Sequence, residues 1–171
     1  MLRRIQRVFK HRWANEAHRT FSDACLLKLQ TLIANSESLH SGEIRICIES
    51  GLPNSYLLRA DITPVLLRQR AMAQFGRLRV WDTEHNNGVM IYLCLAERSI
   101  ELIADRGVNR FVSAGQWDSV VKRLSTAMSE GDLEGGLVRA IAEVGEVLQQ
   151  HFAVQAGHTN PNELPDAPAL I

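Results

Sequence analysis

The segment 82–87 holds the residues best suited to chemistry in this chain, and it stands immediately before an apolar run. Two carboxylates, one imidazole and two carboxamides occur there: Asp82, Glu84, His85, Asn86 and Asn87. Carboxylate and carboxamide oxygens are ligands that hard cations such as Ca²⁺ and Mg²⁺ prefer. Asn87 and Gly88 accept positive φ at low cost, so this pair indicates a tight turn that leads into a strand. The segment is therefore a candidate cation-binding loop at the mouth of a sheet.

Hydrophobic periodicity predicts the elements that must position this loop. Strict alternation over 43–49 predicts one strand. The apolar runs 89–95 and 100–104 predict two more strands, and the short link between them implies an antiparallel hairpin. Apolar residues at helical spacing predict helices over about 23–40 and 63–79, then one that ends at Gly131 and one from Asp132 to Phe152.

The order helix, strand, helix, strand, strand, helix, helix predicts an α/β domain. The first two strands are joined through a helix, so we expect them to be parallel with a right-handed crossover. The nearly unbroken apolar run 89–95 needs cover on both faces. We therefore expect a three-layer sandwich, with a small mixed β-sheet between helices.

This topology brings acidic residues from three distant segments to one edge of the sheet. Parallel strands begin at the same edge, and an antiparallel third strand ends there. The expected ligands of a divalent cation, Ca²⁺ or Mg²⁺, are Glu43, Asp82, Glu84, Asn87 and Asp105. Carboxylates that lie close together repel one another unless a cation or an arginine relieves them. The arginines in position to do so, or to hold a phosphate, are Arg45 and Arg106.

Two alternatives stand beside this interpretation. Ligands of open parallel sheets usually lie at the carboxyl ends of the strands, which points to Glu49, Ser50 and the turn 96–99 instead. Acidic, Asn-rich loops are also common as solvated turns without a ligand.

Composition and charge exclude several classes of protein. The 171 residues have a formal net charge of +0, which argues against a dedicated nucleic-acid-binding protein. The three cysteines form no metal-binding spacing and indicate a reducing compartment. No apolar run is long enough to span a membrane, and the first residues lack the apolar core of a secretory signal. A cytoplasmic location is the resulting expectation.

The two ends of the chain differ from its body. Residues 1–19 are expected to form a basic helix, because five basic and no acidic residues fall within 1–13 and apolar residues recur there at helical spacing. Residues 2–13 of this helix would either dock on the domain or lie against an anionic membrane as a peripheral contact. The domain proper is expected over 20–153, and residues 154–171 are expected to be a disordered tail because they are rich in Gly, Asn and Pro.

No motif identifies a reaction. The sequence contains no P-loop, no GxSxG, no HExxH and no dinucleotide-binding glycine pattern. No nucleophile or general base can be assigned, so the catalytic residues are unknown.

Three separated motifs in their order along the chain resemble the TPM domain family. They are Gly42–Ile46 after an amphipathic helix, Asn87–Ile91, and Ile103–Gly107 at the end of the hairpin. The resemblance covers roughly residues 20–152 and implies a three-layer α/β fold. Members of this family are described as phosphatase-like, some bind divalent cations through acidic residues, and some assist membrane-protein complexes such as photosystem II. The aspartate usual in the family before Asn-Gly is Asn86 here.

Two functions follow as hypotheses. In the first, favoured by the resemblance, the domain is a phosphatase-like hydrolase whose carboxylates hold a metal, while a bound water attacks and Arg106 steadies the phosphoryl oxygens. In the second, favoured by the lack of an assignable base, it is a non-catalytic accessory module that contacts a protein partner. Any cation is then purely structural.

Overall fold

Four strands form one mixed sheet, and their order across it is β3-β2-β1-β4. The structure is a computed structural model that describes residues 11, 20–154 and 161–171. The strands are β1 (Ile44–Glu49), β2 (Val89–Cys94), β3 (Ser99–Ala104) and β4 (Ala169–Leu170). β1 is parallel to β2 and to β4, whereas β3 is antiparallel to β2. The expected parallel pair and hairpin are thus confirmed.

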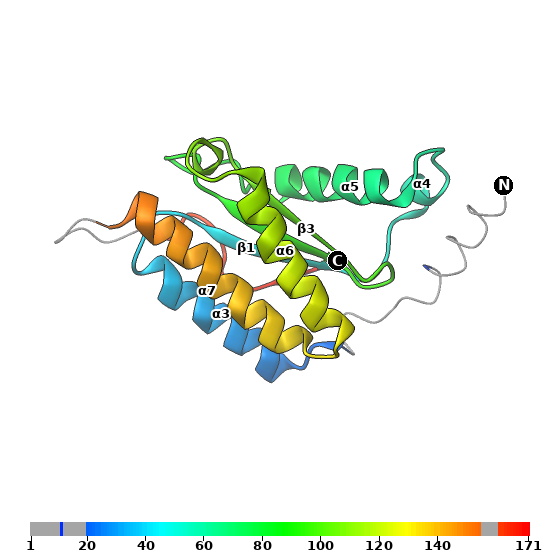
Figure 1. Ribbon diagram of the computed structural model, residues 1–171, viewed down its shortest axis with the longest axis horizontal. Coiled ribbons are helices and arrows are strands. Elements are labelled where there is room, and N and C mark those ends of the chain that lie inside the picture. The colour runs from blue at the N-terminus through cyan, green and yellow to red at the C-terminus, as the bar shows by residue number, and fades with distance from the viewer. Residues whose placement is uncertain (1–10, 12–19, 155–160) are drawn as a thin grey trace.

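Helices cover both faces of this sheet (Figure 1). One face carries α3 (Asp23–Glu37), α6 (Ala114–Ser129) and α7 (Leu133–Phe152), which pack against one another and against β1 and β3. The opposite side carries α5 (Thr63–Arg77), which follows the short helix α4 (Asn54–Leu57). A 3₁₀ turn, η1 (Val108–Arg110), connects β3 to α6. The arrangement is the expected three-layer α/β sandwich.

Alternate residues of the strands supply two separate apolar cores. Ile44, Ile46 and Ile48 point to the side of α3 and α7, together with Val89 and Ile91. Residues of the other parity, such as Cys47, Met90 and Tyr92, join the core beneath α5. The period of two in β1 and β2 therefore explains why both faces of the sheet need helices.

Side-chain caps fix where most helices begin. Ser22 Oγ accepts the backbone N–H of Cys25 at the start of α3, and Asp132 accepts that of Gly135 at the start of α7. Ser113 and Gln116 form a capping box on α6. α5 begins at Thr63 without such a cap, because Ile62 takes the cap position and makes no side-chain hydrogen bond.

The expectation of a disordered tail over 154–171 is wrong for the part that the structure describes. Residues 161–171 lie along β1, where β4 extends the sheet and Ile171 exchanges backbone hydrogen bonds with Ile48 and Ser50. We call residues 161–171 the strap. Polar groups at the start of β1 hold it, and Leu164 and Leu170 pack against the two cores.

The expected basic helix over 1–19 lies outside the described residues, apart from His11. That histidine is buried, accepts the backbone N–H of Leu52 at Nδ1 (2.9 Å) and contacts Glu97 through Nε2 (2.7 Å). Among the described residues, no helix has both the length and the apolar character to cross a membrane. The three cysteines are buried free thiols.

Candidate functional site

The starts of β1 and β2 and the end of β3 lie at one edge of the sheet, which we call the rim. Glu43 O accepts the backbone N–H of Val89 (2.8 Å), and Gly88 O accepts that of Asp105 (2.9 Å). These two hydrogen bonds extend the strand registers by one residue and place Glu43, Gly88 and Asp105 side by side. The expected convergence of three distant segments is therefore confirmed for the backbone.

The loop 82–87 is held in place by its own hydrogen bonds. Thr83 Oγ1 accepts the N–H of Asn87 (3.0 Å), and Thr83 O accepts that of Asn86 (3.1 Å). The positive φ (53°) falls on Asn86 rather than on the Asn87-Gly88 pair expected from the sequence. A Cβ at Gly107 would come within 2.5 Å of the carbonyl oxygens of His85 and Asn86, so only glycine permits this close approach of the hairpin end to the loop.

Glu43 uses its carboxylate to hold the strap. Its oxygens accept the backbone N–H groups of Glu163 (3.2 Å) and Leu164 (3.1 Å). Burial raises the pKa of the Glu43 carboxyl to about 7, although these two hydrogen bonds favour the charged form. Glu163 in turn accepts the backbone N–H of Glu84 (3.0 Å), so the strap adds to the rim a carboxylate that sequence reasoning missed.

Three of the other charged candidates at the rim already have partners of their own. Asp82 is paired with Arg79 at 2.6 Å on the surface, and it points to that guanidinium rather than to Glu43. Arg106 Nε donates to Asn86 Oδ1 (2.8 Å). Arg45 donates to the carbonyl oxygens of Pro165 and Ala167 in the strap. The rim is thus a network in which both expected phosphate-binding arginines donate to acceptors from the chain itself.

Two buried oxygens at the rim lack a hydrogen-bond partner. Asn87 is fully buried and donates through Nδ2 to Ser41, which leaves its Oδ1 unpartnered. Asp105 Oδ1 accepts the N–H of Arg106 (2.6 Å), whereas its Oδ2 is buried without a partner. A buried oxygen without a donor is costly, so both atoms call for a positively charged or donor ligand.

A second acid that the sequence did not single out lies beneath the rim. Glu37, at the end of α3, accepts the backbone N–H of Ile44 at 2.7 Å. Burial, together with the nearby charge of Glu43, raises the pKa of the Glu37 carboxyl to about 9. This group is therefore a neutral carboxylic acid at pH 7, which is unsuitable as a cation ligand.

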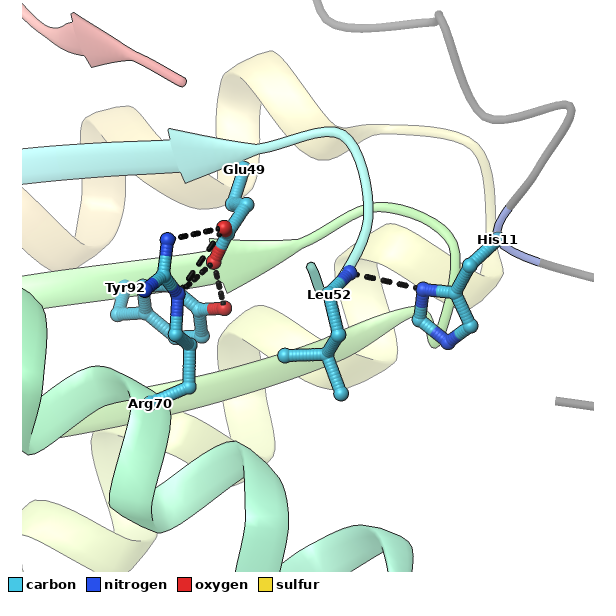
Figure 2. A network of polar contacts seen from close by, with 5 residues as sticks. All are labelled: His11, Glu49, Leu52, Arg70 and Tyr92. Atoms are coloured by element: carbon cyan, nitrogen blue, oxygen red, sulfur yellow. Dashed lines mark hydrogen bonds and ion pairs between the residues drawn. The ribbon is translucent and has the colours of Figure 1, made fainter. Parts of the chain in front are cut away.

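The opposite edge of the sheet carries a buried polar cluster (Figure 2). Arg70 of α5 makes a bidentate ion pair with Glu49 at the end of β1, with N–O distances of 2.6–3.0 Å. The Tyr92 hydroxyl donates to the same carboxylate at 2.6 Å, and burial raises the pKa of this phenol. At the alternative site expected around Glu49, the carboxylate therefore already accepts hydrogen bonds from Arg70 and Tyr92. Arg70 and Tyr92 were missed, since only the tertiary fold brings them to Glu49.

A groove of about 650 Å³ runs along the outer edge of β3, between α5 and the start of α6. Arg68 and Asn109 line it. Arg68 donates to the carbonyl oxygen of Leu102 (3.0 Å), and Asn109 donates to that of Ala104 (2.7 Å). Trp117 lines it, and its buried indole N–H has no acceptor. No sequence signal pointed to this groove.

The acids of the rim do not form a site from carboxylates alone. In the part of the chain that the structure describes, no three His, Cys, Asp or Glu side chains are grouped so that they could hold a metal ion. Asp105 and Asn87 do offer oxygens of the type that Ca²⁺ accepts, and Ca²⁺ sites commonly add backbone carbonyls and water. The residues at the rim thus fit a Ca²⁺-like ion better than a transition metal.

Comparison with known proteins identifies the fold. A family model described as the TPM domain matches residues 15–147. The NMR structure of BA42 protein from the psychrophilic bacterium Bizionia argentinensis superposes with a TM-score of 0.74 and 24% identity, over 91% of this chain and 98% of that one. The solution NMR structure of the N-terminal domain of a protein from P. gingivalis gives a TM-score of 0.61 and 18% identity, over 89% of this chain and 93% of that domain. A search of curated proteins found no match.

Proposed function

This chain belongs to the TPM domain family, and from that premise we propose that it is an accessory domain that binds a divalent cation at the rim and catalyses no reaction. The observation that carries the proposal is the pair of buried, unpartnered oxygens, Asn87 Oδ1 and Asp105 Oδ2. A cation is a ligand that each of these oxygens would accept, whereas an apolar or anionic ligand would satisfy neither.

The proposed ligand set is smaller than the one expected from the sequence. Asp105 and Asn87 supply side-chain oxygens, and backbone carbonyls of the loop 82–87 together with water complete the coordination. Glu43 is omitted because its carboxylate already accepts two backbone N–H groups from the strap. Asp82 is omitted because it is exposed and paired with Arg79. Such a set, with one carboxylate and neutral oxygens, suits Ca²⁺ better than Mg²⁺, which demands strict octahedral geometry.

The engagement of the arginines supports a non-catalytic role. A phosphatase-like hydrolase at the rim would need positive charge at the phosphoryl oxygens, and an arginine is the usual side chain that supplies it beside a metal ion. Arg45 donates to the strap, so it could bind a phosphate only after those contacts break, and Arg106 already donates its Nε to Asn86. A bound cation would instead tie the loop 82–87 to the end of β3 and stiffen this edge for contact with a partner.

Two assays on the full chain test the proposal. The first is thermal unfolding with chelator, with Ca²⁺ and with Mg²⁺. Binding to the folded state alone should stabilise it by about 2.7 kcal/mol at a Ca²⁺ concentration of about 100 Kd. The second is hydrolysis of p-nitrophenyl phosphate under the same conditions, for which we expect no turnover. Cation-dependent turnover that Asp105→Ala abolishes would show a hydrolase, and an unfolding temperature that no cation changes would refute the cation site.

A further inference from the structure

The outer surface of the segment 58–81 collects most of the large apolar side chains that the described structure leaves exposed. Five of them, which we call the α5 patch, are between 40% and 66% exposed: Leu58, Ile62, Val65, Met72 and Trp81. The remaining exposed large apolar residues are scattered over other elements. Contiguous exposed apolar surface on a monomer usually marks an interaction site.

The patch follows from the way α5 packs. The helix buries Leu66, Ala71 and Phe75 against the sheet. Val65 and Met72 are seven residues apart, which is two helical turns, so they lie above one another on the opposite side of α5. Figure 1 shows α5 and the short α4 on one side of the sheet, while α3, α6 and α7 gather on the other.

The charges around the patch are mostly positive. Residues 58–82 contain five arginines and two aspartates. Arg70 is held by Glu49 and Arg68 is paired with Glu101. The positive charge of the patch therefore comes from Arg59, Arg77 and Arg79. Arg77 lies on the flank of α5 and is exposed. Arg79 is 71% exposed even though it pairs with Asp82. Arginine binds phosphate groups through two N–H donors at once, so this flank is complementary to a phosphate-bearing surface.

We propose that the α5 patch docks on an anionic lipid membrane, with its apolar side chains in the interface and its arginines on lipid phosphates. An apolar stripe flanked by arginines is the pattern of a helix that lies in the membrane plane. Trp81 at the end of the stripe is a residue type enriched at the boundary between lipid and water. The proposal does not depend on the cation site, which lies at the rim.

Co-sedimentation of the full chain with lipid vesicles tests this proposal, with a chelator present so that cation binding plays no part. The vesicles are phosphatidylcholine alone and an equimolar mixture of phosphatidylcholine and phosphatidylglycerol. We expect binding to the mixed vesicles, weakened by salt, and little binding to phosphatidylcholine. Val65→Asp with Met72→Asp should weaken binding about tenfold or more, because it removes buried apolar area and adds negative charge.

A matched variant controls for charge and fold. Leu27→Asp with Leu39→Asp replaces two leucines of similar exposure (63% and 52%) on the opposite side of the sheet and should bind as the parent does. Arg77→Gln with Arg79→Gln, which leaves the apolar stripe intact, should weaken binding roughly fivefold per arginine. Circular dichroism checks that each variant is folded.

Three results would overturn the proposal. The first is a parent chain that does not bind mixed vesicles. The second is a variant with Val65→Asp and Met72→Asp that binds as well as the parent, which would assign binding to another segment such as residues 2–13. The third is a parent that self-associates in sedimentation velocity, binds no vesicles and is made monomeric by the patch variant, which would make the patch a contact between copies of the chain.

Discussion

The carboxylate of Glu43 accepts the backbone N–H of Leu164 at 3.1 Å, across 121 positions of sequence. An acid that was expected to bind a cation therefore holds the strap against β1. Arg45, two positions along the same strand region, reinforces this by donating to strap carbonyls. The strap therefore occupies the Glu43 carboxylate, and the rim oxygens that remain without a hydrogen-bond partner are those of Asn87 and Asp105.

The raised pKa values beneath the rim predict how stability depends on pH. Folded Glu37 keeps its proton up to about pH 9, whereas the unfolded chain releases it near the ordinary value of 4.5. Between these values the folded state binds more protons, so the free energy of unfolding falls as pH rises. The raised pKa of the Glu43 carboxyl contributes to the same decrease in the free energy of unfolding up to about pH 7.

Glu37→Gln should remove most of this dependence. The glutamine retains an oxygen for the N–H of Ile44 and needs no proton. In urea unfolding at about pH 8, we expect the free energy of unfolding of this variant to exceed that of the parent by on the order of 2 kcal/mol. Near pH 5 we expect almost no difference. Glu146→Gln, at an exposed position of α7, serves as the control and should change stability by less than about 0.5 kcal/mol. Equal gains at both pH values would contradict the assignment.

The Glu49–Arg70 ion pair predicts strong coupling between β1 and α5. Arg70→Leu leaves a buried carboxylate with only the Tyr92 hydroxyl, and should cost about 3–5 kcal/mol in urea unfolding. Glu49→Leu combined with Arg70→Leu should cost less than Arg70→Leu alone, because no unpaired charge remains.

The exposed pair Arg123–Glu143 provides a comparison for this cluster. Its guanidinium is 59% exposed, so Arg123→Leu should cost about 0–1 kcal/mol. The losses in free energy of unfolding caused by Glu49→Leu and by Arg70→Leu should not add in the double variant. If they do add, Glu49 and Arg70 are not energetically coupled.

The unpartnered indole of Trp117 predicts an unusually mild effect of a core substitution. Trp117→Phe removes a buried N–H that has no acceptor, and this gain of about 1–3 kcal/mol offsets the loss of packing. We expect thermal unfolding to place this variant within about 1 kcal/mol of the parent, whereas Trp117→Ala should cost about 3–5 kcal/mol. A loss of several kcal/mol for Trp117→Phe would mean that the N–H has an acceptor in solution.

The parts of the fold that depend on local pattern were predictable from the sequence. Alternation in 44–49 and the apolar run 89–94 fixed two strands, and the helix between them implied that they are parallel. The edge of the sheet that gathers Glu43, the loop 82–87 and Asp105 followed from this topology alone.

The remaining features depend on contacts between distant residues. The strap has no periodicity, and its place depends on distant partners: Glu43 and Arg45 bind its backbone, and Leu164 enters the core beneath α5. The sequence also does not indicate which residue pairs with each acid, because Glu49 contacts Arg70 only after α5 packs on the sheet. Whether a carboxylate is free to bind a cation is therefore a tertiary property. The cation, the protein partner and the cytoplasmic location stay predictions.

Calorimetric titration of Ca²⁺ into the full chain, the Asp105→Asn variant and the Asp82→Asn variant tests the proposed site most directly. Both variants lose one carboxylate charge from the same edge, but only Asp105 belongs to the proposed ligand set. We predict one site in the parent, affinity lowered by about tenfold or more in Asp105→Asn, and parent-like affinity in Asp82→Asn. A parent chain that binds no Ca²⁺, or an Asp105→Asn variant that binds it as tightly as the parent, would contradict this account.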